Sequence, residues 1–192
     1  DFLENKNKVV KNYLTKLTPK IVWDLGSNIG IFSRITSSKE IPTISFDIDP
    51  ACVEKNYHEA IKEKDTYLLP LLLDLNNPSP GIGWENQERT SLLGRGPADT
   101  VIALALIHHL VISNNLPLQK IAEFFNKISH SLIIEFIPKS DQMIQKLLSN
   151  REDIFTQYTQ SNFEKEFTNF FKIIESETIN PLSRTLYLMQ KK

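Results

Sequence analysis

The chain has 192 residues, of which 41% are hydrophobic and 23% are charged, an ordinary composition for a folded globular domain. Its net charge is −1 and its pI is near 6.5, so the chain lacks the excess of basic residues that is typical of proteins that bind nucleic acid tightly. The single cysteine, Cys52, excludes an internal disulfide, and no apolar run has the length of a membrane span. We therefore expect one domain, residues 1–192, in the cytoplasm.

Hydrophobic periodicity predicts helices and strands that alternate along most of the chain. In chain order the prediction is an N-terminal helical segment (1–19, with the helix at 2–17), strand 21–25, helix 30–38, strand 43–47, helix 49–64, strand 67–73, a long polar stretch (76–97), strand 100–105, helix 117–128, strand 132–136, helices at 140–149 and 161–170, and strands 172–178 and 185–190.

This alternation predicts an α/β fold with a doubly wound, mostly parallel sheet that has helices on both faces. The apolar runs "YLLPLLL" (67–73) and "TVIALAL" (100–106) favour strands buried on both faces. The short segment "INPLSR" (179–184) has the composition of a turn, so the last two strands should be antiparallel.

The first predicted strand runs into "DLGSNIG" (24–30), where an apolar run meets a loop with two glycines. In open α/β sheets, ligands bind at the carboxyl ends of the strands, and Gly26 and Gly30 allow the backbone to pass close to one. A dinucleotide fingerprint is excluded because Asn28 and Ile31 stand where it needs glycine, and no P-loop sequence is present. The second strand ends in another acid, Asp47, which suits the two hydroxyls of a ribose.

This conjunction, with "FDIDP" (46–50) and "LLLDL" (71–75), resembles the class I S-adenosylmethionine-dependent methyltransferases. The resemblance implies a seven-stranded sheet in the order 3-2-1-4-5-7-6, whose C-terminal strand is antiparallel. It implies S-adenosylmethionine as cofactor, with Asp24 suited to its ammonium group and Ile48 and Asp74 to its adenine. The expected cofactor-binding residues are Asp24, Gly26, Ser27, Asn28, Gly30, Asp47, Ile48, Asp74, Leu75 and Ala105. Ser27 and Asn28 depart from the glycine-richest form of the motif.

Residues 74–117 are similar to a bacterial branch of this superfamily that is related to host-specific nodulation methyltransferases. The similarity extends to "IIEFIPKSDQMIQKLL" (133–148) and "SRTLYLM" (183–189). It implies that this domain forms the C-terminal part of a longer protein, as does a first residue, Asp1, that is not methionine. It does not identify the acceptor of the methyl group.

Acceptor-side residues should follow the fourth and fifth strands, across from the cofactor. Methyl transfer needs alignment above all, and it needs a base only if the attacking atom carries a proton. In "ALIHHL" (105–110) we expect His108 to face the acceptor as the catalytic base and His109 to pack against the fold. Glu135, at the end of the fifth strand, is the second catalytic candidate, and the alternative is an ordinary exposed carboxylate. No further His or Cys stands at ligand spacing, so we expect no metal.

The polar stretch 76–98 is a candidate substrate lid because it is longer than a typical connection. Trp84 and Arg89 within it are candidate substrate-binding residues, although Trp84 would equally anchor the loop to the domain. Asn114 and Asn115 are also candidates, with an ordinary loop as the alternative.

The function expected from these features is methyl transfer to a small-molecule acceptor, such as a hydroxyl of a carbohydrate-containing metabolite. Leu104 stands where amino-group methyltransferases with an [ND]-P-P-[YF] motif have a polar residue, which argues against that chemistry. Two alternatives remain open, namely a methyltransferase of RNA or protein and a catalytically inactive cofactor-binding module.

Overall fold

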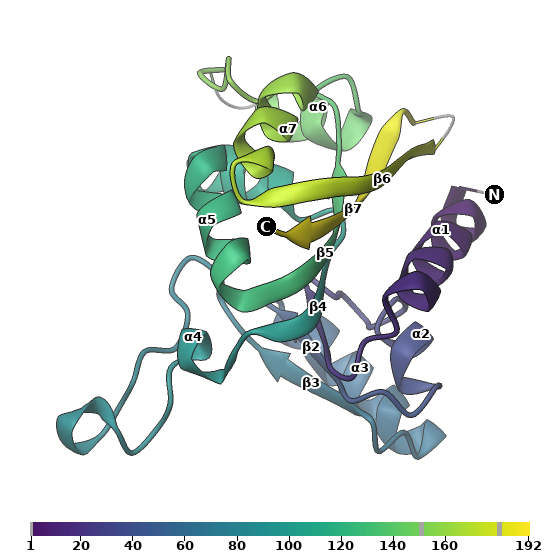
Figure 1. Cartoon of the computed structure of the whole chain (residues 1–192), viewed down its shortest axis with the longest axis vertical. Coiled ribbons are helices and arrows are strands. Elements are labelled where there is room, and N and C mark those ends of the chain that lie inside the picture. Colours follow the sequence, from purple (N-terminus) through teal and green to yellow (C-terminus); the bar gives the residue numbers. More distant parts are fainter. Residues whose placement is uncertain (1, 150–151, 180–181) are drawn as a thin grey trace.

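The computed structural model describes residues 2–149, 152–179 and 182–192, and its centre is a seven-stranded sheet (Figure 1). The strands are β1 (Val22–Leu25), β2 (Thr43–Asp47), β3 (Leu68–Leu72), β4 (Ala98–Ala103), β5 (Ser129–Phe136), β6 (Phe171–Ile179) and β7 (Arg184–Lys191). They lie in the order β3-β2-β1-β4-β5-β7-β6, and β7 is antiparallel to both of its neighbours. The predicted fold class and strand order are confirmed. The turn expected at 179–184 includes residues 180 and 181, which lie outside the described residues.

Helices cover both faces of this sheet, as the alternation along the sequence predicts (Figure 1). They are α1 (Phe2–Leu17), α2 (Arg34–Ser37), α3 (Pro50–Glu63), α4 (Leu92–Arg95), α5 (Leu118–Ile128), α6 (Gln142–Leu148) and α7 (Gln160–Thr168). Helices α1 and α2 pack with Val22 and Ile102 on one face, and α4 to α7 pack with Trp23 and Val101 on the other. Adjacent residues of a strand point to opposite faces, so each buried strand contributes to both layers. None of these helices is long and apolar enough to cross a membrane.

Two predictions made from hydrophobic runs are wrong in detail. The helix expected at 30–38 is reduced to α2, because Gly30 has a φ of +78° that an α-helix cannot contain, and turns precede Arg34. Strand β3 is not buried on both faces, because it pairs only with β2 at the sheet edge, and Leu69 and Leu72 are 51% and 60% exposed.

The polar stretch 76–97 extends away from the sheet as an arm (Figure 1). It contains a short 3-10 turn (Trp84–Asn86), a bridge between Ile82 and Arg89, and helix α4, none of which the sequence predicts. After β4 the chain also forms a π-helical turn (His109–Ser113), a feature that occurs frequently at functional sites.

An aromatic cluster anchors the C-terminal part of the fold. Phe163 of α7 is fully buried, and its ring centroid lies 4.4 Å from that of Phe167, 5.3 Å from that of Phe136 and 5.1 Å from that of Tyr187. The cluster therefore joins α7 to β5 and β7.

Replacing Phe163 by Ala should lower the free energy of unfolding by about 3–5 kcal/mol, because the lost contacts leave a cavity that the rigid sheet cannot close. Urea unfolding monitored by circular dichroism measures the change. The matched variant Phe163→Leu keeps most of the volume and should lose less than half as much. Equal losses in the two variants would show that packing volume is not the cause.

Candidate cofactor and acceptor site

The loop after β1 is hydrogen-bonded to the end of β2. The backbone amides of Gly26 and Ser27 both donate to the carbonyl of Phe46, at 2.9 and 3.0 Å. The amide of Asn28 donates to Oδ2 of Asp47 at 2.7 Å. These bonds fix the glycine loop against the acid that ends β2, so the two halves of the predicted motif meet.

Three residues of this loop have positive φ: Gly26 (+73°), Asn28 (+52°) and Gly30 (+78°). Asn tolerates this left-handed conformation better than most side chains, which explains how the chain departs from the glycine-rich pattern at position 28. A Cβ at Gly26 would lie 3.2 Å from Cδ1 of Leu106, and one at Gly30 would collide with the amide of Asn56. A side chain at position 30 would therefore disturb the packing of the loop against α3.

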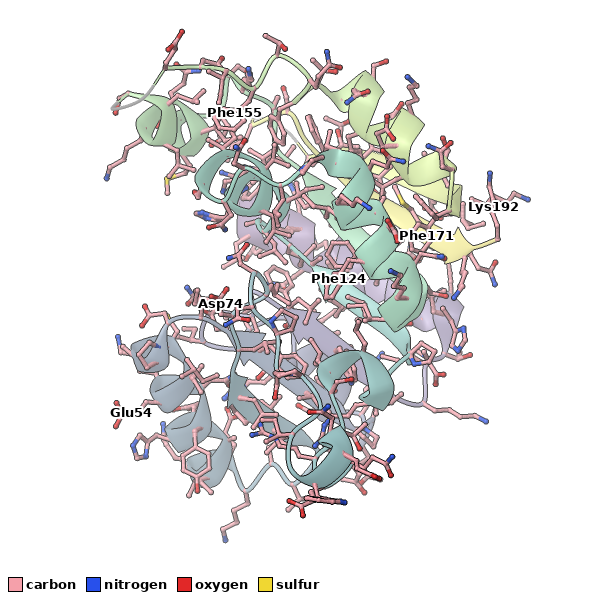
Figure 2. All side chains as sticks on the ribbon, turned by 90° about the vertical axis from the view of Figure 1, so that its left-hand side faces the viewer. Glu54, Asp74, Phe124, Phe155, Phe171 and Lys192 are labelled. Carbon is pink, nitrogen blue, oxygen red and sulfur yellow. The ribbon has the colours of Figure 1, made fainter. Side chains whose placement is uncertain are left out.

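A cavity of about 550 Å³ lies at the carboxyl ends of β1, β2 and β4. The predicted residues that line it are Gly26, Asn28, Asp47, Ile48, Asp74, Leu75, Ala105 and Asn114. Figure 2 shows Asp74 between the parts of the molecule that carry Glu54 and Phe155. Ser27 and Gly30 shape the loop without lining the cavity. Asp49 and Ser113, which the sequence did not single out, also line it, and so does His109, which was expected to pack against the fold.

Asp47 is placed to bind polar groups of a ligand. Its Oδ2 accepts from the amide of Asn28, and its Oδ1 accepts from the amide of Asp49 at 2.9 Å. Each carboxylate oxygen has two acceptor positions, so one on each oxygen remains for a ligand. Beside it Ile48 is 61% exposed and offers an apolar surface to a ring.

Asp24 lies beneath the loop rather than in the cavity. Its side chain is buried, and its Oδ2 accepts from the hydroxyl of Ser33 at 2.6 Å. Burial raises the pKa of Asp24 to about 6, although the Ser33 hydrogen bond and the nearby ammonium of Lys6 oppose the rise. Asp24 does not line the cavity, and its expected contact with a ligand ammonium stays a prediction.

The two histidines lie opposite to expectation. His108 is 3% exposed and does not line the cavity, and its Nδ1 is buried without a hydrogen-bond partner among the described residues. Burial lowers the pKa of His108 to about 3. His109 is exposed and lines the cavity, and desolvation lowers its pKa while Asp47 opposes the change. Of the two rings, that of His109 is the one placed to meet an acceptor.

Glu135 is buried and does not line the cavity, so the alternative of an exposed strand-end carboxylate is wrong. Its Oε2 accepts from Nζ of Lys6 at 2.6 Å and from the amide of Ala105 at 2.7 Å. The carboxylate therefore supports the turn after β4, and through Ala105 it reaches the cavity wall indirectly.

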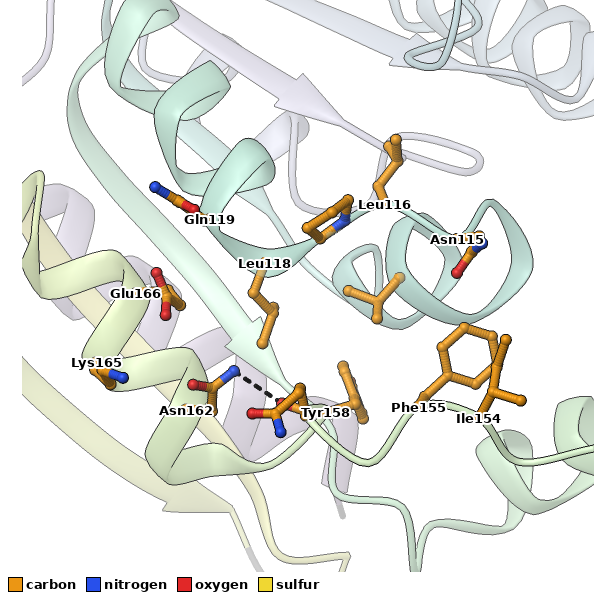
Figure 3. Close-up of a pocket in the computed structure, with 13 residues that line it drawn as sticks. Asn115, Leu116, Leu118, Gln119, Ile154, Phe155, Tyr158, Asn162, Lys165 and Glu166 are labelled. Carbon is orange, nitrogen blue, oxygen red and sulfur yellow. Dashed lines mark hydrogen bonds between the residues drawn. The ribbon is translucent and has the colours of Figure 1, made fainter.

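The other substrate candidates are spread over the molecule. Trp84 is 79% exposed on the arm, Arg89 is exposed beside it, and neither lines the cavity. The lid thus stays a prediction, with the arm extended in this structure. Asn115 lines a second hollow of about 360 Å³, on the far side of the π-helical turn, with Phe155 and Asn162 (Figure 3).

Within the described residues no group of three His, Cys, Asp or Glu side chains could hold a metal ion.

No protein-family model matches the chain. It is 33% identical over 188 residues to nodulation protein NoeA of Rhizobium meliloti (strain 1021), a match that spans 97% of this chain and 39% of that relative's length. Magnesium protoporphyrin IX methyltransferase (ChlM) of Synechocystis PCC 6803, solved with bound SAH, has a TM-score of 0.69 at 16% identity and covers 100% of this chain and 84% of its own. The N-methyltransferase NodS of Bradyrhizobium japonicum WM9 has a TM-score of 0.69 at 9% identity, with 99% and 96% coverage.

The strand order and the glycine loop bound to an acidic β2 end define a class I methyltransferase fold. The chain shares the fold of the methyltransferases ChlM and NodS, and it is similar in sequence to nodulation protein NoeA. It corresponds to about two fifths of NoeA.

Protonation of buried Asp24 should give a measurable pH dependence of stability. Because its folded-state pKa of about 6 lies above the ordinary value of 3.8, the folded protein gains stability as the pH falls through 6 towards 4, and this gain is absent at pH 7.5. Asp24→Asn removes the titration, so the free energy of unfolding of the variant minus that of wild type should be roughly 2 kcal/mol higher at pH 7.5 than at pH 4.5.

Urea unfolding at the two pH values measures this difference. Asp99→Asn is the matched control, because the half-buried Asp99 carboxylate accepts from the Lys20 amide outside the core. A difference between the pH values that is the same for both variants would rule out Asp24 as its source.

Proposed function

We propose that the chain transfers a methyl group from S-adenosylmethionine to a hydroxyl of a small, carbohydrate-containing acceptor. The observation that carries the proposal is the cavity at the sheet switch point, where the glycine loop is hydrogen-bonded to Asp47. When bound, the cofactor supplies a methyl group on a sulfonium, which is already activated for displacement. The task of the protein is then to align an acceptor with it.

The lining residues fit the chemical parts of this cofactor. The free acceptor positions of Asp47 suit the two ribose hydroxyls, and the exposed side chain of Ile48 suits a flat face of adenine. The Asp74 carboxylate, whose Oδ1 accepts from the Asn76 amide at 2.8 Å, suits an amino group of the base. Gly26 lines the cavity, so the backbone of its loop suits contact with the methionine part.

His109 is the residue we assign to the acceptor side. It lines the cavity near its apolar wall of Leu104 and Leu106, and its lowered pKa leaves the imidazole neutral at pH 7 with a lone pair that can take a hydroxyl proton. Ser113 and Asn114 follow on the same wall and can hydrogen-bond neighbouring hydroxyls. This assignment replaces His108, which the fold buries.

The charges around the cavity favour a neutral acceptor over a nucleic acid. Asp47, Asp49 and Asp74 all line it, so a phosphate backbone would meet like charge on entry. The whole chain also carries a net charge of −1. Both observations are compatible with a sugar hydroxyl as the reacting group.

Removal of the Asp47 carboxylate should weaken the cofactor site. Asp47→Ala should reduce binding of S-adenosylhomocysteine by about 1–3 kcal/mol, since polar groups of the ligand and the Asn28 amide lose their acceptor. Isothermal titration calorimetry measures the affinity. Glu54→Ala, which removes an exposed carboxylate from α3, is the control and should bind as wild type does. Unchanged affinity in Asp47→Ala would refute the assignment.

His109 should affect turnover much more than cofactor binding. General-base assistance contributes typically 10²–10⁴-fold, so His109→Ala should lower turnover by about that factor and leave the affinity for S-adenosylhomocysteine nearly unchanged. Methyl transfer from labelled S-adenosylmethionine into glycan and small-molecule extracts provides the assay.

Three comparisons separate the possible roles. His109→Asn can hydrogen-bond but cannot act as a base, so activity in Asn but not in Ala indicates orientation of the acceptor. His58→Ala is the control on the exposed face of α3. Full activity in His109→Ala would exclude the residue, and cofactor binding by wild type without any transfer would favour an inactive binding module.

A further inference from the structure

A buried carboxylate connects three distant parts of the chain below the cavity. Glu135 of β5 is 0% exposed, and its Oε2 accepts both from Nζ of Lys6 in α1 and from the amide of Ala105 after β4. Lys6 is itself only 5% exposed, and 129 residues separate it from Glu135. One oxygen atom therefore links the N-terminal helix, the fifth strand and the end of the fourth.

The Ala105 end of this link forms part of the cavity wall. Ala105 has a φ of +50°, a conformation that costs free energy for a residue other than glycine, and it lines the cavity between Leu104 and Leu106. Its amide has no strand partner at the point where β4 ends, and the carboxylate of Glu135 satisfies it. The hydrogen bond thus stabilises the strained turn that the cavity needs.

The Lys6 end of the link compensates the buried charge. An isolated carboxylate in the core would be strongly destabilising, and the ammonium at 2.6 Å offsets that cost. The Lys6 ammonium also lies 5.1 Å from the ring centroid of Phe32, and Nη1 of Arg184 lies 4.0 Å from Oε1 of Glu135. Burial lowers the pKa of Lys6, and the contact with Glu135 opposes the change.

From this geometry we infer that Lys6 and Glu135 are positioning residues for the methyl-donor site. Lys6 keeps the Glu135 carboxylate in place, the carboxylate holds the Ala105 amide, and the held turn gives the β4 side of the cavity its shape. The inference rests on the proposed function in so far as donor binding is its readout. It assigns the N-terminal helix a role in a site that it does not line.

Two double variants test this role without leaving one charge unpaired. Lys6→Met with Glu135→Gln removes both charges but keeps an oxygen that can accept from the Ala105 amide. Lys6→Met with Glu135→Met removes the charges and the acceptor together. The two proteins differ only in the group that meets Ala105, so a shared loss of stability cancels in their comparison. Lys11→Met, at an exposed position of the same helix, is the control.

Calorimetry with S-adenosylhomocysteine and amide hydrogen exchange of the unliganded protein are the two measurements. The Gln double variant should bind within about threefold of wild type, and the Met double variant roughly 10- to 100-fold more weakly. Exchange at the Ala105 amide should stay slow in wild type and the Gln variant and become fast in the Met variant.

Equal affinities for the two double variants, or slow exchange at Ala105 in both, would overturn the inference. Failure of wild type to bind S-adenosylhomocysteine would instead overturn the proposed function. The exchange measurement then still decides whether Glu135 holds the turn, so the two failures are distinguishable.

Discussion

The site depends on three backbone amides that donate to the end of β2. Gly26, Ser27 and Asn28 present their N–H groups to Phe46 and Asp47, and this is possible only because the loop turns through left-handed conformations at positions 26 and 28. The bonds bring the loop of one βα unit against the acid of the next. The cavity, its carboxylate and its exposed apolar neighbour Ile48 all follow from that single juxtaposition.

Beneath the cavity, buried charges hold the ends of the strands. Asp24 is bonded to Ser33, and Glu135 is shared by Lys6 and Ala105. Buried ion pairs generally add little to stability, because desolvation of both charges offsets their attraction. Geometry explains the buried Glu135 better, since its carboxylate binds the amide of Ala105, which lines the cavity. A buried charge can therefore contribute little to the free energy of unfolding and still determine the geometry of the site.

The fold leaves the acceptor open. ChlM is a magnesium protoporphyrin IX methyltransferase and NodS an N-methyltransferase, yet both share this architecture at a TM-score of 0.69. Specificity must therefore come from groups outside the shared strands, because a common sheet presents the same edge to every acceptor. Under the proposed function the candidates are His109 and Ser113 of the π-helical turn and Asn114 directly after it, all of which line the cavity.

The sequence by itself determined the sheet topology and the position of the glycine loop and Asp47 at one edge of the sheet, because both depend on local order along the chain. A chain of alternating strands and helices can form only a few sheet topologies. Gly26 and Asp47 each follow or end a parallel strand, so both lie at the same edge of the sheet. Only the tertiary structure decided which histidine faces the cavity, since adjacent residues of a helical turn point about 100° apart and the packing of the π-helical turn sets the direction. It also decided that β3 is exposed, because β3 lies at the edge of the sheet. The burial of Glu135 depends on Lys6, which lies 129 residues away in α1, and no local sequence pattern indicates a contact over that separation.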